Sequence, residues 1–227
     1  MKEQSKHTTE NSEEMHGQEQ SRPQLPEPSL RRLPWYLAYI EILRDSGVVT
    51  VSSTQISRAL NVDASQIAKD LSLLDIKGKT RIGYEIDDLA CALSEFLGFR
   101  TTHKAFVMGC GSLGGSLMRD KGLSNYGLEI VCGFDTNPEL VGSQIGDVPV
   151  RHISEMPKCQ KEMGASIGIL TVPADKAQES ADYMVAAGLT GIWNFTPYRI
   201  RVRNGIAKAN TQIYAHLALL YNRLESF

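Results

Sequence analysis

Apolar residues recur at helical spacing after residue 32. Leu33, Leu37, Ile40 and Leu43 fall on one face of a helix, and the pattern stops at Asp45-Ser-Gly. Apolar side chains at intervals of three and four residues mark the buried face of an amphipathic helix. The spacing therefore predicts a helix that begins near Leu33 and ends just before the glycine.

Two short amphipathic segments follow, separated by a candidate turn at Asn61. Ser52 or Ser53 precedes the first segment and Asp63 precedes the second, and all three residue types favour helix N-caps. The positions expected to face inward are Ile56, Ala59, Leu60, Ile67, Leu71 and Leu74. The positions expected to face outward on the second helix, to varying degrees, are Gln66, Lys69, Asp70 and Leu73. Two short helices with a tight turn between them predict a helix-turn-helix.

A glycine- and lysine-rich stretch, residues 77–84, follows where a winged-helix domain has its β-wing. Its Lys and Arg side chains are suited to contacts with DNA phosphates. The alternative is an ordinary helical domain with a solvated, charged face, and the pattern alone leaves both interpretations open.

A glycine motif follows a predicted buried strand over residues 104–109. It reads Gly109-x-Gly111-x-x-Gly114, and a second strand ends at Asp135. The first glycine permits a tight turn, the second lets the backbone approach a pyrophosphate, and the third lets the helix pack on the strand. A carboxylate about 20 to 26 residues further on is placed to accept hydrogen bonds from an adenosine ribose. The combination predicts a dinucleotide site and is far more specific than the glycines alone.

Strands and helices continue to alternate, with strands expected at 148–153, 166–172 and 191–195 and a helix at 175–187. This alternation predicts a parallel, doubly wound α/β sheet whose ligand lies at the carboxyl ends of the strands. The segments 171–173 and 194–197 lie at such ends and are expected to line the crevice, although both also fit simple turns. The last segment, residues 211–227, predicts a helix whose apolar face packs on its own domain or on a partner subunit.

The first 29 residues are rich in Glu, Gln, Ser and Pro, which predicts a disordered tail. The tail holds three Lys or Arg against six Asp or Glu, and this explains why the whole chain has a net charge of −2. A locally basic face is therefore compatible with a near-neutral chain. We expect no membrane span, no secretion signal, no metal site and four reduced cysteines, which fits a cytoplasmic protein.

Several motifs also resemble those of the Rex family of redox-sensing transcriptional repressors. They are Arg32-Leu-Pro-Trp-Tyr, the segment 51–71, Ile82-Gly-Tyr, the glycine motif at 109–114, Gly142-x-x-Ile-Gly-x-Val-Pro-Val, Ile169-Leu-Thr-Val-Pro-Ala and Gly191-Ile-x-Asn-Phe-Thr-Pro-x-Arg. The resemblance covers roughly residues 30–225 in order, and the last three motifs are the most specific to the family.

The resemblance implies a homodimer that binds double-stranded, palindromic operator DNA when NAD⁺ dominates and releases it when NADH binds. The implied domains are a tail (1–29), a winged-helix DNA-binding domain (30–100), a Rossmann NAD(H)-binding domain (101–208) and a swapped C-terminal helix (209–227). The residues expected to contact the cofactor are Gly109, Cys110, Gly111, Ser112, Leu113, Gly114, Asp135, Thr171, Val172, Pro173, Phe195 and Thr196. Those expected to contact DNA are Ser65, Gln66, Lys69, Ser72, Lys77, Lys79, Arg81 and Tyr84.

The chain departs from the family pattern in two regions. The recognition helix lacks one arginine and a Tyr-Phe pair, and Arg81 stands where the wing usually has glycine. Ala38, Asp120 and Gln212 stand where the family has an Arg, a Tyr and an Asp that exchange partners with cofactor state. A ligand shifts an equilibrium only through different contacts in the two states, so we hypothesise that NADH coupling is weakened or rewired.

The alternative function is a nucleotide-binding enzyme, a dehydrogenase or a CoA-ligase-like subunit, with a helical appendage. Only His152 lies near a predicted strand end as a candidate base, and a surface position explains it as well. Cys110 in the glycine turn could sense oxidants through a lowered thiol pKa, although a small residue filling a loop is the simpler interpretation. We therefore expect no catalytic residues.

Overall fold

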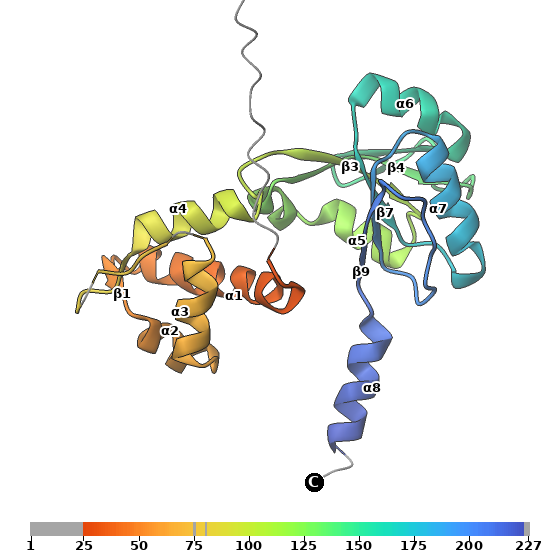
Figure 1. Ribbon diagram of the computed structural model, residues 1–227. Coiled ribbons are helices and arrows are strands. Elements are labelled where there is room, and N and C mark those ends of the chain that lie inside the picture. The colour runs from red at the N-terminus through yellow and green to blue at the C-terminus, as the bar shows by residue number, and fades with distance from the viewer. Residues whose placement is uncertain (1–24, 75, 80, 225–227) are drawn as a thin grey trace, which may run out of the picture. The chain divides into compact units, whose positions relative to one another are not determined.

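The computed structural model describes residues 25–74, 76–79 and 81–224, which form two compact units divided between Phe96 and Leu97 (Figure 1). Residues 1–24 of the predicted tail lie outside the described residues. In these residues no helix is both long enough and apolar enough to cross a membrane.

The first unit is a small helical domain with a two-stranded sheet. Its elements are α1 (Glu27–Asp45), β1 (Thr50–Val51), α2 (Ser53–Leu60), α3 (Ala64–Ser72), β2 (Tyr84–Glu85) and α4 (Ile86–Phe96). Strands β1 and β2 pair antiparallel, and Lys79 forms a bridge with Gly83 at the tip between them. The helix-turn-helix followed by a β-wing is confirmed.

The predicted turn chemistry of α2 and α3 is present in the structure. Ser52 forms a capping box with Gln55, in which each side chain satisfies a backbone N–H of the other. Asn61 ends α2 with a left-handed φ of 52°, a conformation that Asn tolerates better than most residues. The Asp63 carboxylate then accepts N–H bonds from the first turn of α3. Local side-chain chemistry thus sets the angle between the two helices.

Helix α1 begins earlier than the apolar pattern predicts. It starts at Glu27, so residues 27–29 are helical rather than part of a tail, and Ser29 is buried. Proline occupies the first turn, where its missing N–H is not needed. The Ser29 hydroxyl accepts a bond from Arg32. A first turn made of Glu, Pro and Ser carries no apolar signal, so periodicity misses it.

Two side chains in the helix-turn-helix do not face as expected. Ala59 was expected to face inward and is exposed, because Ile56 alone fills the inner face of the short α2. Asp70 was expected to face outward and is fully buried. The buried aspartate is ion-paired with Arg32 of α1, which removes the usual cost of burying a charge alone.

The second unit is a seven-stranded sheet covered by helices on both faces. Its elements are β3 (His103–Met108), α5 (Ser112–Arg119), η1 (Gly122–Tyr126), β4 (Leu128–Asp135), β5 (Gln144–Ile145), β6 (Val148–His152), η2 (Ile153–Glu155), α6 (Met156–Met163), β7 (Ile167–Leu170), η3 (Ala174–Lys176), α7 (Ala177–Ala186), β8 (Gly191–Asn194), β9 (Ala207–Asn210) and α8 (Ile213–Leu224). The strand order is β5-β6-β4-β3-β7-β8-β9, and only the β5–β6 pair is antiparallel. Leaving out β5, this is the Rossmann order, with the switch point between β3 and β7. The predicted doubly wound sheet is confirmed.

Side chains of the central strand β3 alternate between two cores. Phe106 and Met108 pack with α6 and α7, whereas Ala105 and Val107 pack on the side of α5. Successive residues of a strand point to opposite faces, so a fully buried strand reads as a continuous apolar run. The two cores hold β3 rigidly, and its carboxyl end delivers the glycine turn.

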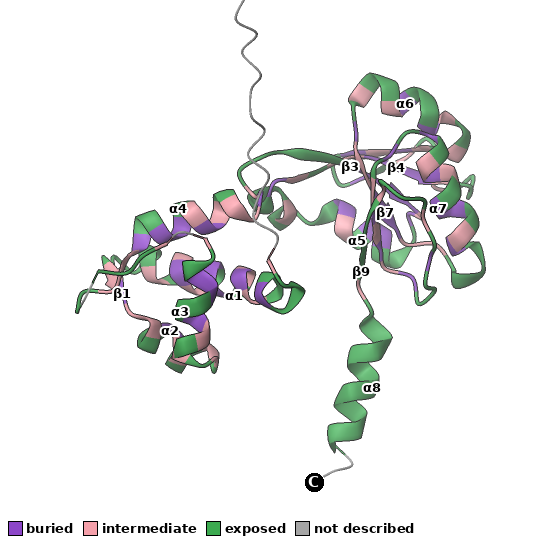
Figure 2. Cartoon of the chain, viewed as in Figure 1, coloured by how far each residue is buried: buried purple, intermediate pink, exposed green. Residues whose placement is uncertain are grey.

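The C-terminal segment contains one strand that the sequence does not reveal. Strand β9 pairs with β8 and runs across the expected boundary between residues 208 and 209, and the helix begins only at Ile213. Every described residue of α8 is exposed, as Figure 2 shows. No described residue therefore buries the apolar stripe of this helix, and the proposed helix exchange is addressed below.

Candidate functional site

The glycine turn connects β3 to α5 at the carboxyl edge of the sheet. Gly109 has a φ of 95°, a left-handed conformation that glycine adopts without strain. A Cβ on Gly114 would overlap the Gly109 carbonyl oxygen, so the helix packs directly on the turn. A Cβ on Gly111 would meet no atom within 4 Å. The first and third glycines are thus required by the protein's own packing, and the second faces open space.

Two polar side chains hold this turn in place. The Thr171 hydroxyl, at the end of β7, donates to the Gly109 carbonyl oxygen at 2.7 Å. The Asp135 carboxylate, at the end of β4, accepts a 2.7 Å bond from the backbone N–H of Cys110. Its other oxygen accepts from the N–H groups of Thr136 and Asn137. Three neighbouring strand ends are therefore tied together around the turn.

A cavity of about 560 Å³ opens beside the turn. Its lining residues are Met108, Gly109, Phe134, Asp135, Thr136, Ile153, Val172, Pro173, Lys176, Glu179, Ser180, Asp182, Tyr183 and Ala186. They come from the ends of β3, β4, β6 and β7 and from helix α7. The volume and the mixed lining, apolar walls with one acidic edge, are typical of a pocket for a small molecule or cofactor.

The expected cofactor residues divide into three groups in space. Gly109, Asp135, Val172 and Pro173 line the cavity. Cys110, Gly114 and Thr171 do not line the cavity but contact Asp135 or Gly109, which do, and Gly111, Ser112 and Leu113 continue the same turn into α5. Phe195 and Thr196 lie at the end of the next strand, where the Phe195 N–H bonds to the Leu170 carbonyl, and neither lines the cavity.

Helix α7 supplies a wall that sequence reasoning missed. Tyr183 and Ile153 both line the cavity, and the Tyr183 hydroxyl donates to the Ile153 carbonyl oxygen at 3.1 Å. Pro173, which precedes the helix, marks its beginning but does not indicate which face turns toward the site. That assignment requires the packing of α7 on the sheet.

The geometry fits a dinucleotide. The N-terminus of α5 offers unpaired backbone N–H groups for a pyrophosphate, and the space at Gly111 lets it approach them. A carboxylate has about four acceptor positions, and three at Asp135 are filled by backbone N–H groups. The remaining position suits a ribose hydroxyl. A phosphate ester at that hydroxyl would be repelled by the carboxylate.

Cys110 and His152 are both used structurally. Burial, with a contribution from Asp135, raises the pKa of the Cys110 thiol to about 12, so the thiolate that oxidants attack is scarce at neutral pH. This argues against a role of Cys110 as an oxidant sensor. The His152 ring accepts a bond from the Ser154 N–H and caps η2. In the described residues no three His, Cys, Asp or Glu side chains gather as a metal site would require.

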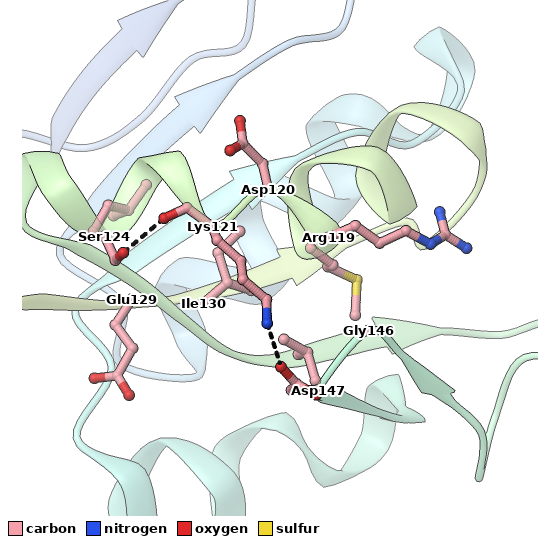
Figure 3. A pocket seen from close by; sticks show the side chains of 11 residues that line it. Arg119, Asp120, Lys121, Ser124, Glu129, Ile130, Gly146 and Asp147 are labelled. Carbon is pink, nitrogen blue, oxygen red and sulfur yellow. Dashed lines mark hydrogen bonds and ion pairs between the residues drawn. The ribbon is translucent and has the colours of Figure 1, made fainter.

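A second, smaller cavity of about 280 Å³ lies at the opposite end of β4 (Figure 3). Lys121 and Asp147 face each other across its mouth at 3.4 Å, and both side chains are almost fully exposed. Exposed pairs of this kind contribute little energy. The cavity holds no buried polar group aimed into it and does not communicate with the glycine turn.

The expected DNA-contact residues form the outer face of α3 and the wing. Ser65, Lys69 and Ser72 are exposed at helical spacing on α3, and Gln66 is half-buried beside them. Lys77, Lys79 and Arg81 are exposed on the wing. Tyr84 is half-buried in β2, and burial raises the pKa of its hydroxyl.

Arg81 has a φ of 66°, a left-handed conformation. This conformation is unfavourable for a residue with a Cβ, and Arg lacks the short polar side chain that helps Asn adopt it. The wing thus retains a strained arginine at its tip, where glycine would be free of strain.

Beneath α3, a buried network fixes the helix to α1. Asp70 accepts two bonds from the Arg32 guanidinium, at 2.7 and 2.9 Å, and one from the Tyr36 hydroxyl at 2.8 Å. Burial alone would raise the pKa of Asp70, but the bonds from Arg32, Tyr36 and Gln66 outweigh it and hold that pKa below its ordinary value. Burial and the bond to Asp70 raise the pKa of Tyr36 to about 12. The aspartate is therefore charged at neutral pH and fully paired.

Comparison with known proteins gives two family matches. Residues 24–72 match a family described as "Putative DNA-binding protein N-terminus", and residues 100–198 match one described as "CoA binding domain". The first match covers α1 to α3, and the second covers the strands around the glycine turn up to the loop after β8.

Full-length relatives are also similar to this chain. The redox-sensing transcriptional repressor Rex of Bacteroides fragilis is 56% identical over 200 residues, which cover 88% of this chain and 91% of that protein. Rex of Porphyromonas gingivalis is 50% identical over 202 residues, which cover 89% of this chain and 93% of that protein.

Solved structures of a further relative match most of the length of this chain. RSP, a Rex-family repressor, is 32% identical. Its complex with β-NAD⁺ and operator DNA superposes with a TM-score of 0.85 and covers 89% of this chain and 94% of that one. Its complex with β-NADH gives a TM-score of 0.80, with 89% and 95% covered.

Proposed function

The chain belongs to the Rex family of redox-sensing transcriptional repressors, and from this premise we propose that it binds operator DNA as a homodimer and responds to NAD(H). The observation that carries the proposal is the joint presence, in one chain, of a helix-turn-helix with a basic wing and a Rossmann site with an acidic strand end. The named relatives are repressors rather than enzymes, so the alternative of a dehydrogenase or CoA-ligase-like subunit is set aside.

We assign the dinucleotide to the cavity beside the glycine turn. Residues 109–114 would hold the pyrophosphate on the N-terminus of α5, and Asp135 would accept from the adenosine ribose. Thr171, Val172 and Pro173 would edge the nucleotide, and Phe195 and Thr196 would lie beside the nicotinamide. The nicotinamide ring supplies the redox signal. Asp135 favours NAD(H) over its phosphorylated counterpart, because a carboxylate repels a 2′-phosphate.

We assign operator contacts to α3 and the wing. Ser65, Gln66, Lys69 and Ser72 would enter or border the major groove, and Lys77, Lys79, Arg81 and Tyr84 would meet the backbone from the wing. Residues 30–100 hold as many basic as acidic residues, nine of each, so one copy carries little net attraction for DNA. Two copies on a palindromic site would double this attraction.

A repressor acts on chromosomal DNA, and we therefore place this one in the cytoplasm.

The uncovered face of α8 supports the homodimer. Leu217, Leu220, Tyr221 and Leu224 form its apolar stripe, and all four are exposed. Apolar stripes of this kind are normally buried, and no described residue of the same chain covers this one. We propose that α8 exchanges between subunits and packs on the partner.

We further propose that the response to NADH is weaker than the family pattern implies. Ala38, Asp120 and Gln212 occupy the positions of the polar partners whose exchange couples cofactor to DNA, and all three are exposed. The Asp120 carboxylate accepts the N–H of Gly122, a local turn contact. Because among the described residues these three form no ion pair that could be gained or lost, the free energy of DNA binding should differ less between the NAD⁺-bound and NADH-bound protein.

One titration tests the function and the coupling separately. A fluorescent duplex, selected by the protein from a random library, is titrated at fixed salt with saturating NAD⁺ and then with saturating NADH. We expect sequence-specific binding in NAD⁺ and less than about a tenfold loss in NADH, which corresponds to about 1.4 kcal/mol. A larger, NADH-specific loss would contradict the weakened coupling. If the protein binds no duplex sequence-specifically, with NAD⁺ or with NADH, the repressor function itself is contradicted.

Replacing Arg81 by Gly should raise stability and weaken DNA binding at once. Removing the left-handed strain should add about 1 kcal/mol to the free energy of unfolding. Losing one phosphate contact per subunit should lower affinity for all duplexes alike and reduce the slope of log affinity against log salt by about 1 to 2 for a dimer. Denaturant unfolding and a salt series of binding isotherms measure the two effects.

Two further Arg81 variants serve as controls. Arg81→Lys keeps the charge and the strain, so its salt slope should stay near that of the wild type. Arg81→Asn tolerates the backbone but lacks the charge, so it should behave like the glycine variant in binding. A glycine variant that is less stable than the wild type would show that the arginine side chain supports the wing.

A further inference from the structure

The side-chain amide of Gln66 is held by one partner in a defined orientation. Gln66 lies in the first turn of α3, and its Nε2 donates to Asp70 Oδ1 at 2.8 Å. A carboxylate only accepts hydrogen bonds, so the amide nitrogen must face Asp70. No described residue bonds to the amide oxygen or to the second amide hydrogen. One donor and one acceptor of the Gln66 amide thus have no partner among the described residues.

Asp70 is itself immobile. Its side chain is fully buried, and both oxygens are bound by the Arg32 guanidinium, with Tyr36 as a further donor. A bidentate pair of this kind fixes direction as well as distance. The orientation of the Gln66 amide is therefore set by helix α1 through a rigid charged link, before any ligand arrives.

A free amide oxygen beside a free amide hydrogen matches one base edge in the major groove. Adenine presents an N7 acceptor and an N6 donor, and Asn or Gln binds the two together. In a helix-turn-helix, the residues that reach base edges lie near the N-terminus of the second helix. Gln66 occupies that part of α3, and its neighbours Ser65 and Lys69 are exposed on the same helix.

Resting on the proposed function, we propose that Gln66 reads an adenine in each half-site and that Asp70 is the positioning residue that orients its amide. A flexible glutamine on a helix surface loses rotamer freedom when it binds. A glutamine whose amide already donates to Asp70 loses less rotamer freedom on binding. Its amide also cannot rotate by 180° to exchange the positions of its oxygen and nitrogen. The buried aspartate thus contributes to base discrimination without touching DNA.

The test compares base-pair preference rather than affinity alone. A duplex selected by the wild-type protein from a random library is varied one base pair at a time, and binding of each variant is measured at constant salt. Wild-type protein should lose about 5- to 150-fold on replacing one particular A·T pair in one half-site, the discrimination expected of a single bidentate contact. Gln66→Ala should bind all bases at that pair within about twofold of one another, because the reading group is gone.

Asp70→Asn and the double variant test the positioning role. Asp70→Asn should weaken discrimination at the same base pair as Gln66→Ala, and the double variant should discriminate no worse than Gln66→Ala alone. A merely structural role of Asp70 would lower affinity evenly across all base pairs. Lys77→Ser on the wing is the matched control for an even loss, because a contact with the DNA backbone carries no base preference.

Two further outcomes overturn the proposal while leaving the repressor function intact. One is that Gln66→Ala weakens every duplex equally, which would make Gln66 a phosphate contact. The other is that Gln66→Ala and Asp70→Asn alter different base pairs. If Asp70→Asn does not fold, Arg32→Lys takes its place: the lysine keeps Asp70 paired but no longer holds it through two parallel bonds, so discrimination at the same base pair should fall. Failure of the wild-type protein to select any duplex contradicts the proposed function instead.

Discussion

Gly114→Ala should lower the affinity of the protein for NADH by about a hundredfold, because losing one or two hydrogen bonds to a charged phosphate costs about 2–4 kcal/mol. The added Cβ would overlap the Gly109 carbonyl oxygen and lie 2.8 Å from the Thr171 hydroxyl. The Gly109 carbonyl oxygen and the Thr171 hydroxyl cannot move away from the new Cβ without breaking the hydrogen bond between them. Helix α5 must therefore move off the turn and carry its N–H groups away from the pyrophosphate. Isothermal titration calorimetry measures the loss.

The adjacent glycine supplies a matched control. A Cβ on Gly115 would meet Arg119 and the Cys110 carbonyl oxygen at 3.4 Å, an ordinary contact. Gly115→Ala should therefore keep NADH affinity within about twofold of the wild type, and its higher helix propensity offsets any small cost. A Gly114→Ala protein that is folded and binds NADH normally would show that the dinucleotide does not use this turn.

The elements that the sequence predicts best are those with a continuous local signal. Strand β4 ends at the predicted residue, Asp135, because its apolar run lies between Gly127 and the Thr-Asn-Pro turn that follows. Strand β9 carries no such signal. Its four residues, Ala207–Asn210, are all exposed and are held at the sheet edge by backbone pairing with β8. Pairing with a distant strand leaves no mark on side-chain periodicity.

The residues of the site divide in the same way, into those that a local motif predicts and those that only tertiary packing brings to the cavity. The glycine turn and Asp135 follow from a motif whose spacing is set by one strand-helix-strand unit. Tyr183 and Ile153 line the same cavity, but only the packing of α7 on the sheet brings the Tyr183 hydroxyl to the Ile153 carbonyl oxygen in η2. Likewise, helical periodicity places Asp70 near the exposed rim of α3. Its burial depends on Arg32, 38 residues earlier, which no local pattern connects to it.

Asp70→Ala should lower the free energy of unfolding of the first unit by about 3–5 kcal/mol, the usual cost of removing one partner of a buried ion pair. The Arg32 side chain is only 20% exposed and would lose both of its carboxylate bonds, and the Tyr36 hydroxyl would lose its acceptor. Urea unfolding followed by circular dichroism measures the change. Exposed Asp87 on α4 is the control, and Asp87→Ala should change stability by no more than about 0.5 kcal/mol.

The charge, rather than the volume, accounts for this loss. Asp70→Leu leaves Arg32 unpaired, whereas Asp70→Leu with Arg32→Met removes both charges, so the double variant should be the more stable of the two. The pKa of Asp70 lies below its ordinary value in the folded state, so its contribution is present above about pH 4. It disappears as pH falls through the folded-state pKa, and wild type and Asp70→Ala should converge in stability there. A difference that persists unchanged in acid would mean that packing, and not the carboxylate, holds α3 against α1.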